Sequence, residues 1–178
     1  MITEFNNITV YHGSFTEVPS PDLKKCKEGK DFGRGFYLTT DKNQAVKFAK
    51  LIAQRYSASY GVLNEYVLSD INDLSYFEFE NTDIDWLNCV VGNRRKQFKH
   101  LSENWKNYDI ISGKVANDDT STVINAYLLG LYGEVGTETA AKTAISNLEP
   151  ENLKNQLCFK TEKSIEKLQF VKSEKVSL

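Results

Sequence analysis

The most informative stretch of the sequence is Asp31-Phe-Gly-Arg-Gly-Phe-Tyr-Leu38, together with Tyr11-His-Gly-Ser14 upstream of it. Side chains in residues 8–14 alternate between two faces, which predicts a strand that ends at a glycine and a serine. Residues 35–40 are rich in aromatic and β-branched side chains and predict a second strand. The segment 15–34 between them carries prolines, glycines and charges and is typical of a surface loop.

An amphipathic helix is predicted directly after the second strand. Asp41 is a candidate N-cap, and Gln44 stands three residues later as a capping-box partner. The apolar positions that follow have helical spacing over about four turns and predict a buried stripe. That stripe consists of Ala45, Phe48, Ala49, Ile52, Ala53 and Tyr56.

The rest of the chain alternates irregularly between strand and helix patterns. Further strands are predicted at 61–69, 75–80, 108–115, 156–160 and 168–171, and further helices at 84–101, 123–131 and 140–148. This mixed order favours the α+β class over a doubly wound sheet. A length of 178 residues fits one domain that spans residues 1–178.

Composition excludes several classes of protein. With 22 Lys and Arg against 24 Asp and Glu, the net charge is −2, which lacks the footprint of a general DNA binder. Three cysteines without a C-x-x-C pair are typical of a reducing compartment, and two histidines without ligand spacing predict no metal site. No apolar run approaches a membrane span, and no secretory signal opens the sequence. The cytoplasm is therefore the expected location.

Each motif also has an ordinary structural interpretation. His12 could be a core histidine, Tyr37 a strand aromatic, and Gly33 and Gly35 turn residues that need a positive φ. A serine hydrolase built on His12 and Ser14 lacks an orienting acid that the sequence can locate. Gly33-Arg-Gly35 also lacks the third glycine of a dinucleotide fingerprint. The conjunction of the motifs is what favours a functional site.

Taken together, residues 11–14, 31–38 and Gln44-Ala45 resemble the NAD-binding core of the ADP-ribosyltransferases, in the poly(ADP-ribose) polymerase-like and diphtheria-toxin-like branch. Asn155-Gln156-Leu157 stands where that branch has an Asn-Glu-Tyr strand. The likeness is dense over residues 11–49, and the whole layout is similar to a small bacterial ADP-ribosyltransferase-like family of unassigned function. This resemblance implies an ADP-ribosyltransferase-like split β-sheet core flanked by helices, with NAD as the substrate.

The resemblance also implies roles for individual residues. His12, Tyr37 and Gln156 would be the catalytic set. The Gly13 backbone would bind the nicotinamide carboxamide, Tyr37 would stack on the nicotinamide ring, and His12 would bond the 2′-hydroxyl of the adenosine ribose. The remaining implied NAD-binding residues are Ser14, Arg34, Gly35 and Gln44, and the second aromatic wall of the nicotinamide pocket would fall at Lys47 or Phe48.

Gln156 replaces the glutamate of the family and keeps a hydrogen bond while losing its charge. A single lost electrostatic contact of this kind costs on the order of 10²–10³ in rate. The resemblance therefore implies an NAD-dependent mono-ADP-ribosyltransferase, a glycosyltransferase that releases nicotinamide and modifies a macromolecular acceptor, expected to be a protein rather than a nucleic acid. An intracellular bacterial toxin with an antitoxin partner would fit. The alternatives are a catalytically weak or inactive NAD- or ADP-ribose-binding module and a slow NAD glycohydrolase.

Overall fold

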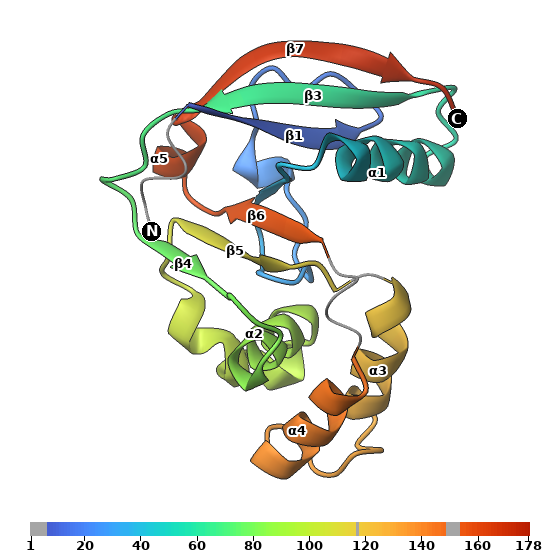
Figure 1. Ribbon diagram of the computed structural model, residues 1–178, viewed down its shortest axis with the longest axis vertical. Coiled ribbons are helices and arrows are strands. Elements are labelled where there is room, and N and C mark those ends of the chain that lie inside the picture. Colours follow the sequence, from blue (N-terminus) through green and yellow to red (C-terminus); the bar gives the residue numbers. More distant parts are fainter. Residues whose placement is uncertain (1–6, 117, 149–153) are drawn as a thin grey trace.

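Two β-sheets meet at one strand contact, with the first sheet at one end of the molecule and the second between it and a group of helices (Figure 1). The computed structural model describes residues 7–116, 118–148 and 154–178. The first sheet is antiparallel, in the order β1 (Ile8–Ser14), β3 (Gly61–Leu68) and β7 (Leu168–Val176). The second has the order β2 (Phe36–Leu38), β6 (Asn155–Phe159), β5 (Ile110–Lys114) and β4 (Tyr76–Glu78), and β4 runs parallel to β5.

Helices pack against the first sheet and lie beyond the second. In Figure 1, α1 lies beside the first sheet, while α2, α3 and α4 lie beyond the second. The helices are η2 (Leu23–Lys25), α1 (Lys42–Arg55), α2 (Ile84–Arg94), the 3₁₀ segment η3 (Lys96–Trp105), α3 (Asp118–Leu128), α4 (Glu138–Ser146) and α5 (Glu162–Ile165). Helices and mixed sheets in this irregular order confirm the α+β class that the sequence predicted.

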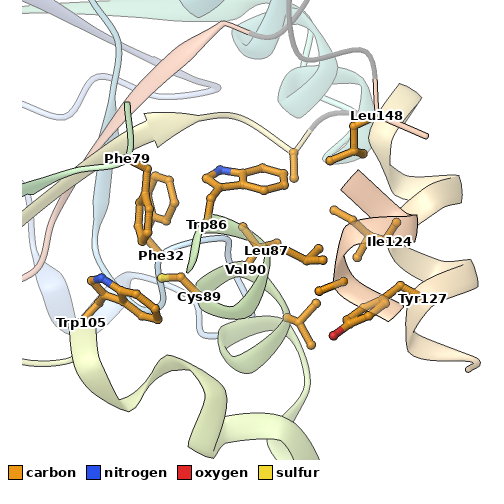
Figure 2. Close-up of a cluster of buried hydrophobic side chains, with 14 of the residues drawn as sticks. Phe32, Phe79, Trp86, Leu87, Cys89, Val90, Trp105, Ile124, Tyr127 and Leu148 are labelled. Atoms are coloured by element: carbon orange, nitrogen blue, oxygen red, sulfur yellow. The ribbon is translucent and has the colours of Figure 1, made fainter. Parts of the chain in front are cut away.

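Side-chain alternation along the second sheet creates two separate cores. Phe36 and Leu38 of β2, with Leu157 and Phe159 of β6, face the first sheet and pack there with buried residues such as Tyr66. The intervening Tyr37 and Cys158 face the opposite way, towards the helices. Figure 2 shows this second core, in which the α2 side chains lie between an aromatic group on one side and α3 with Leu148 on the other. The second sheet is therefore buried on both faces.

The apolar stripe predicted for α1 is wider than the one the protein buries. Ala45, Ala49 and Ala53 are buried, whereas Phe48 is 44% exposed and Tyr56 47% exposed. The helix approaches β1 so closely that a Cβ on Gly13 would lie 2.2 Å from the Ala45 carbonyl oxygen. Since only small side chains fit at that separation, the expectation that Phe48 belongs to the core was wrong.

The N-cap of α1 is confirmed, but the capping box is not formed. The Asp41 carboxylate accepts from the backbone N–H groups of Asn43 and Gln44, at 2.9 and 3.2 Å. The Gln44 side chain instead accepts a hydrogen bond from Thr39 Oγ1 at 2.7 Å. Gln44 is therefore drawn towards the strand contact between the two sheets.

The single helix predicted for residues 84–101 is divided. α2 ends at Arg94, Arg95 is extended, and Phe98 has non-helical backbone angles inside η3. The chain folds back so tightly that a Cβ on Gly92 would lie 2.6 Å from the Ser102 nitrogen. Apolar spacing continues across this reversal because both segments pack against the same core, and the periodicity alone could not reveal the break.

Candidate functional site at the junction of the two sheets

The junction of the sheets leaves one glycine with unpaired backbone groups. Tyr11 and Thr39 exchange two backbone hydrogen bonds, at 2.8 and 3.0 Å, so the polar groups of Tyr11 point towards β2. In an antiparallel strand these directions alternate, and the N–H and C=O of Gly13 therefore point to the same edge. In the part of the chain that the structure describes, neither group forms a backbone hydrogen bond on that side. One donor and one acceptor thus lie on the edge of β1 that faces β2.

His12 reaches across this junction to β2. Its Nδ1 lies 2.8 Å from the Tyr37 carbonyl oxygen, and its ring lies 4.3 Å from that of Phe36, centre to centre. Because a carbonyl oxygen only accepts, Nδ1 carries the proton and Nε2 of the neutral ring is an acceptor. Loss of solvent around the ring lowers the pKa of His12 from 6.5 to about 4. The neutral, Nε2-accepting form is therefore the stable one at neutral pH.

The lowered pKa of His12 gives an expected pH dependence of stability. The unfolded chain protonates this histidine near pH 6.5 and the folded protein only near pH 4, so the unfolded state binds more protons between those values. The free energy of unfolding should fall by up to about 3 kcal/mol as the pH drops across this window.

Urea denaturation at several pH values measures this fall. A His12→Gln variant should lose that part of the pH dependence, whereas the matched variant His100→Gln, at the exposed second histidine, should keep it. Equal pH profiles for wild type and His12→Gln would contradict the assignment.

Asn64 holds the turn that follows His12, and sequence analysis did not identify it. This fully buried side chain accepts from Val18 N at 2.8 Å and donates to the carbonyl oxygens of Thr16 and His12, at 3.2 and 3.4 Å. A lone asparagine within the apolar strand of residues 61–68 was the available signal. It fixes the direction in which the chain leaves β1.

Tyr37 is half-buried on β2, and its hydroxyl closes the loop before it. The hydroxyl donates to the Gly33 carbonyl at 2.8 Å and accepts from Phe32 N at 3.0 Å. Burial raises the pKa of Tyr37 well above its usual value, so this hydroxyl stays protonated. Gly33 adopts a φ of 90°, as the turn interpretation expects. The ring, rather than the hydroxyl, is the part of Tyr37 that a ligand could use.

Gln156 lies on β6, the strand that pairs with β2. Tyr37 pairs with Cys158, so Gln156 is its diagonal neighbour, about 7–8 Å away. The buried Gln156 donates from Nε2 to Asp31 Oδ2 at 2.8 Å. A carboxylate only accepts, which fixes the orientation of the amide and leaves its Oε1 as the second, accepting end. His12, Tyr37 and Gln156 therefore come from three neighbouring strands.

A buried ion pair between Asp31 and Arg94 holds the hydrogen-bond partner of Gln156 in place, and no sequence motif indicated this pair. Asp31 Oδ1 accepts from Arg94 Nε and Nη2 at 2.9 and 2.6 Å, and Asp31 Oδ2 also accepts from Ala116 N at 3.0 Å. Arg94 in turn donates to the Ala116 carbonyl at 2.8 Å. One carboxylate thus joins the loop before β2, helix α2 and the end of β5 to Gln156.

The other predicted NAD-binding residues are placed less uniformly. Gln44 lies against Thr39 at the junction, and Ser14 ends β1, where its Oγ accepts from Thr16 N at 3.4 Å. Gly35 has no positive φ, and a Cβ there would lie 2.4 Å from Cys158 Sγ, so close packing against β6 requires this glycine. The exposed Arg34 forms an ion pair with Glu28 at 3.3 Å.

Both candidates for the second aromatic wall are exposed on α1. Lys47 and Phe48 follow Gln44 by three and four residues, and residues at these separations share a helix face. Because Phe48 is not used by the core, its ring is available for contact with a ligand. Of the two, Phe48 has the flat apolar surface that a wall requires.

Two surface hollows among the described residues lie away from the junction. One, of about 470 Å³, is lined by Asp83, Ile84, Asp85, Gly136 and Glu138. The other, of about 500 Å³, is lined by Arg95, Gln97, Asn125, Leu128 and Leu129. Neither is lined by any of the predicted site residues.

Comparison with known proteins shows the family. A family model described as "Protein of unknown function (DUF3990)" matches residues 8–170, which include the second sheet and the first sheet up to the start of β7. The chain belongs to this family. No curated protein and no solved structure matches this DUF3990 chain.

Over residues 7–116, 118–148 and 154–178, no group of three or more His, Cys, Asp or Glu side chains is placed to hold a metal ion. Among the same residues, no helix combines the length and apolar character that crossing a membrane requires.

Proposed function

We propose that this protein is an NAD-dependent mono-ADP-ribosyltransferase, with an ADP-ribosyltransferase-like core formed by the two sheets. The observation that carries the proposal is the unpaired N–H and C=O of Gly13 at the edge of β1 that faces β2, the strand that carries Tyr37. A carboxamide offers one donor and one acceptor and matches this pair. The nicotinamide group of NAD carries such a carboxamide on an aromatic ring.

The neighbouring side chains suit the rest of NAD. His12 Nε2 can accept a hydrogen bond from a ribose hydroxyl, since the Tyr37 carbonyl holds the proton on Nδ1. Gln156 Oε1 can accept a hydrogen bond from a hydroxyl of the other ribose, since the amide nitrogen of Gln156 donates to Asp31. Both groups are neutral acceptors whose orientation is set before a substrate arrives, which is the preorganisation that catalysis requires.

The proposed step breaks the bond between nicotinamide and the ribose C1′. The bonding electron pair leaves with nicotinamide, which becomes neutral, and positive charge develops on the ribose. An acceptor nucleophile then bonds to C1′ and loses its proton. Gln156 orients the ribose but adds no negative charge, and the charge of Asp31 is balanced by Arg94. Slow turnover is therefore expected, by a factor on the order of 10²–10³ relative to a carboxylate at this position.

Incubation with NAD labelled in both the nicotinamide and the adenosine parts tests the proposal. We expect nicotinamide release together with transfer of the adenosine label to an acceptor in a cell lysate. His12→Ala should reduce nicotinamide release at least about tenfold, the scale of one charge-free hydrogen bond to a substrate. His100→Gln, at the exposed second histidine, is the matched control and should leave nicotinamide release nearly unchanged.

A second candidate is an NAD-binding module with little or no turnover. If some turnover remains, this module would be a slow NAD glycohydrolase. The hydrogen bond from Gln156 Nε2 to Asp31 Oδ2 favours this second candidate, because the amide nitrogen already has a partner within the protein. This candidate predicts NAD binding by calorimetry without transfer of label. Water would be the nucleophile in the glycohydrolase.

A further inference from the structure

Two exposed aromatic side chains stack on each other at the end of β1. Phe15, the residue after Ser14, and Tyr56, the C-cap of α1, have ring centres 4.7 Å apart and planes inclined by 20°. Phe15 is 36% exposed and Tyr56 47% exposed. Such a pair on the surface is not needed for the core, whose aromatic residues are buried elsewhere. A flat ring surface is therefore presented to solvent.

Positive side chains surround this pair. Lys27 Nζ donates to the Tyr56 hydroxyl at 2.6 Å and lies 5.3 Å from the ring centre. Lys27 lowers the pKa of Tyr56, and Arg55 and Lys30 add to that effect. Within the described residues, none of these three cations forms an ion pair with a carboxylate. Their charge is therefore available to a partner. We call Phe15, Lys27, Lys30, Arg55 and Tyr56 the aromatic–cation face.

The charge of the whole chain conceals this local excess. Residues 22–55, which form the loop before β2, β2 itself and α1, contain nine Lys and Arg against four Asp and Glu, a net charge of +5. The remainder of the chain carries −7. The net charge of −2 argued against a general DNA binder, but the charge is divided between two regions.

Helix α1 continues the face towards the junction of the sheets. Phe48 and Arg55 are seven residues apart, so they lie on the same side of the helix at about 10 Å along its axis. Phe48 is 44% exposed and Leu51, next along that side, is 55% exposed. The exposed side chains of Phe48 and Leu51 thus lie on the same side of α1 as the positive charge of Arg55.

We propose that the aromatic–cation face binds single-stranded nucleic acid. Exposed rings on which bases stack, bordered by cations that meet the phosphates, are what single-strand binding requires. A protein partner is the less suitable occupant, because lysine is depleted from the buried centre of protein interfaces. A duplex is also less suitable, because its bases are already stacked on each other. The inference goes beyond the proposed function and needs neither NAD nor turnover.

Fluorescence anisotropy with a labelled oligothymidylate of about 12 nucleotides tests this proposal. We expect the wild-type protein to bind at low salt, more tightly than it binds a duplex of the same length. Phe15→Ala should weaken binding about tenfold, which corresponds to about 1.4 kcal/mol. Lys27→Glu with Lys30→Glu should weaken binding at least tenfold and reduce the slope of log Kd against log salt by about 1.4, since each single-strand phosphate contact contributes about 0.7.

The matched control is Lys96→Glu with Lys99→Glu in η3, which makes the same change of charge on exposed lysines away from α1. Binding should be nearly unchanged in this variant. Circular dichroism checks that each variant is folded. Equal losses in the control and in the Lys27 and Lys30 variant would overturn the proposal, as would no binding below about 100 µM. Polyglutamate is a further test. If it competes with the oligonucleotide and its affinity is unchanged in Phe15→Ala, the proposal is overturned in favour of an acidic protein partner.

Discussion

Arg94→Met is expected to lower the free energy of unfolding by about 3–5 kcal/mol, because it leaves the Asp31 charge buried without its partner. The Asp31 side chain is 9% exposed and that of Arg94 24% exposed, so water replaces little of the lost interaction. The two bonds from the guanidinium to Asp31 Oδ1, at 2.9 and 2.6 Å, are both lost. Methionine keeps the volume of the side chain and limits the effect to charge and hydrogen bonding.

Urea denaturation of wild type and variant measures this loss. The matched control is Arg34→Met, whose ion pair with Glu28 has both side chains more than half exposed and should contribute only about 0–1 kcal/mol. Adding Asp31→Asn to Arg94→Met should recover part of the stability, because the buried charge is removed. A loss below about 1 kcal/mol for Arg94→Met would contradict the view that this pair anchors the loop before β2.

Gln156→Glu is expected to give no gain in nicotinamide release, although it restores the glutamate of the family that the sequence resembles. The new carboxylate would face Asp31 Oδ2 where the amide now donates at 2.8 Å. Two like charges at that distance cannot both be ionised in a buried site. The variant should therefore be destabilised at neutral pH.

The swapped variant, Asp31→Asn with Gln156→Glu, should behave differently. It restores one amide–carboxylate hydrogen bond, keeps the net charge of the network, and moves the negative charge from residue 31 to residue 156. We expect nicotinamide release to rise by up to about 10²–10³ over wild type, the scale of one electrostatic contact to the transition state. Greater release by the single variant than by the swapped one would contradict this role for Asp31.

The sequence predicted much of the local structure, because local signals determine it. The strand at 8–14 and the N-cap at Asp41 are where the pattern placed them. The helix of residues 84–101 was predicted as one segment because its apolar spacing continues through a reversal that depends on Gly92 and Ser102 packing together. The spacing reports which face is buried and not whether the axis continues.

The support of the candidate site could not be predicted from motifs. Asp31 belongs to the motif at residues 31–38, but its partners Arg94 and Gln156 are 63 and 125 residues away and no local pattern links them. Gly35 was interpreted through backbone angle, whereas close packing against Cys158 requires it. Phe48 was assigned to the core because helical spacing cannot tell how near the helix approaches its sheet. Long-range contacts determined each of these outcomes.

Nicotinamide release from NAD by the purified wild-type protein tests the central claim most directly. If the protein is an NAD-dependent ADP-ribosyltransferase, we expect slow release that is proportional to the amount of protein and lost in a folded His12→Ala variant. When lysate is present, we also expect adenosine label on an acceptor. No nicotinamide above the level of a protein-free control, with and without lysate, would contradict the claim.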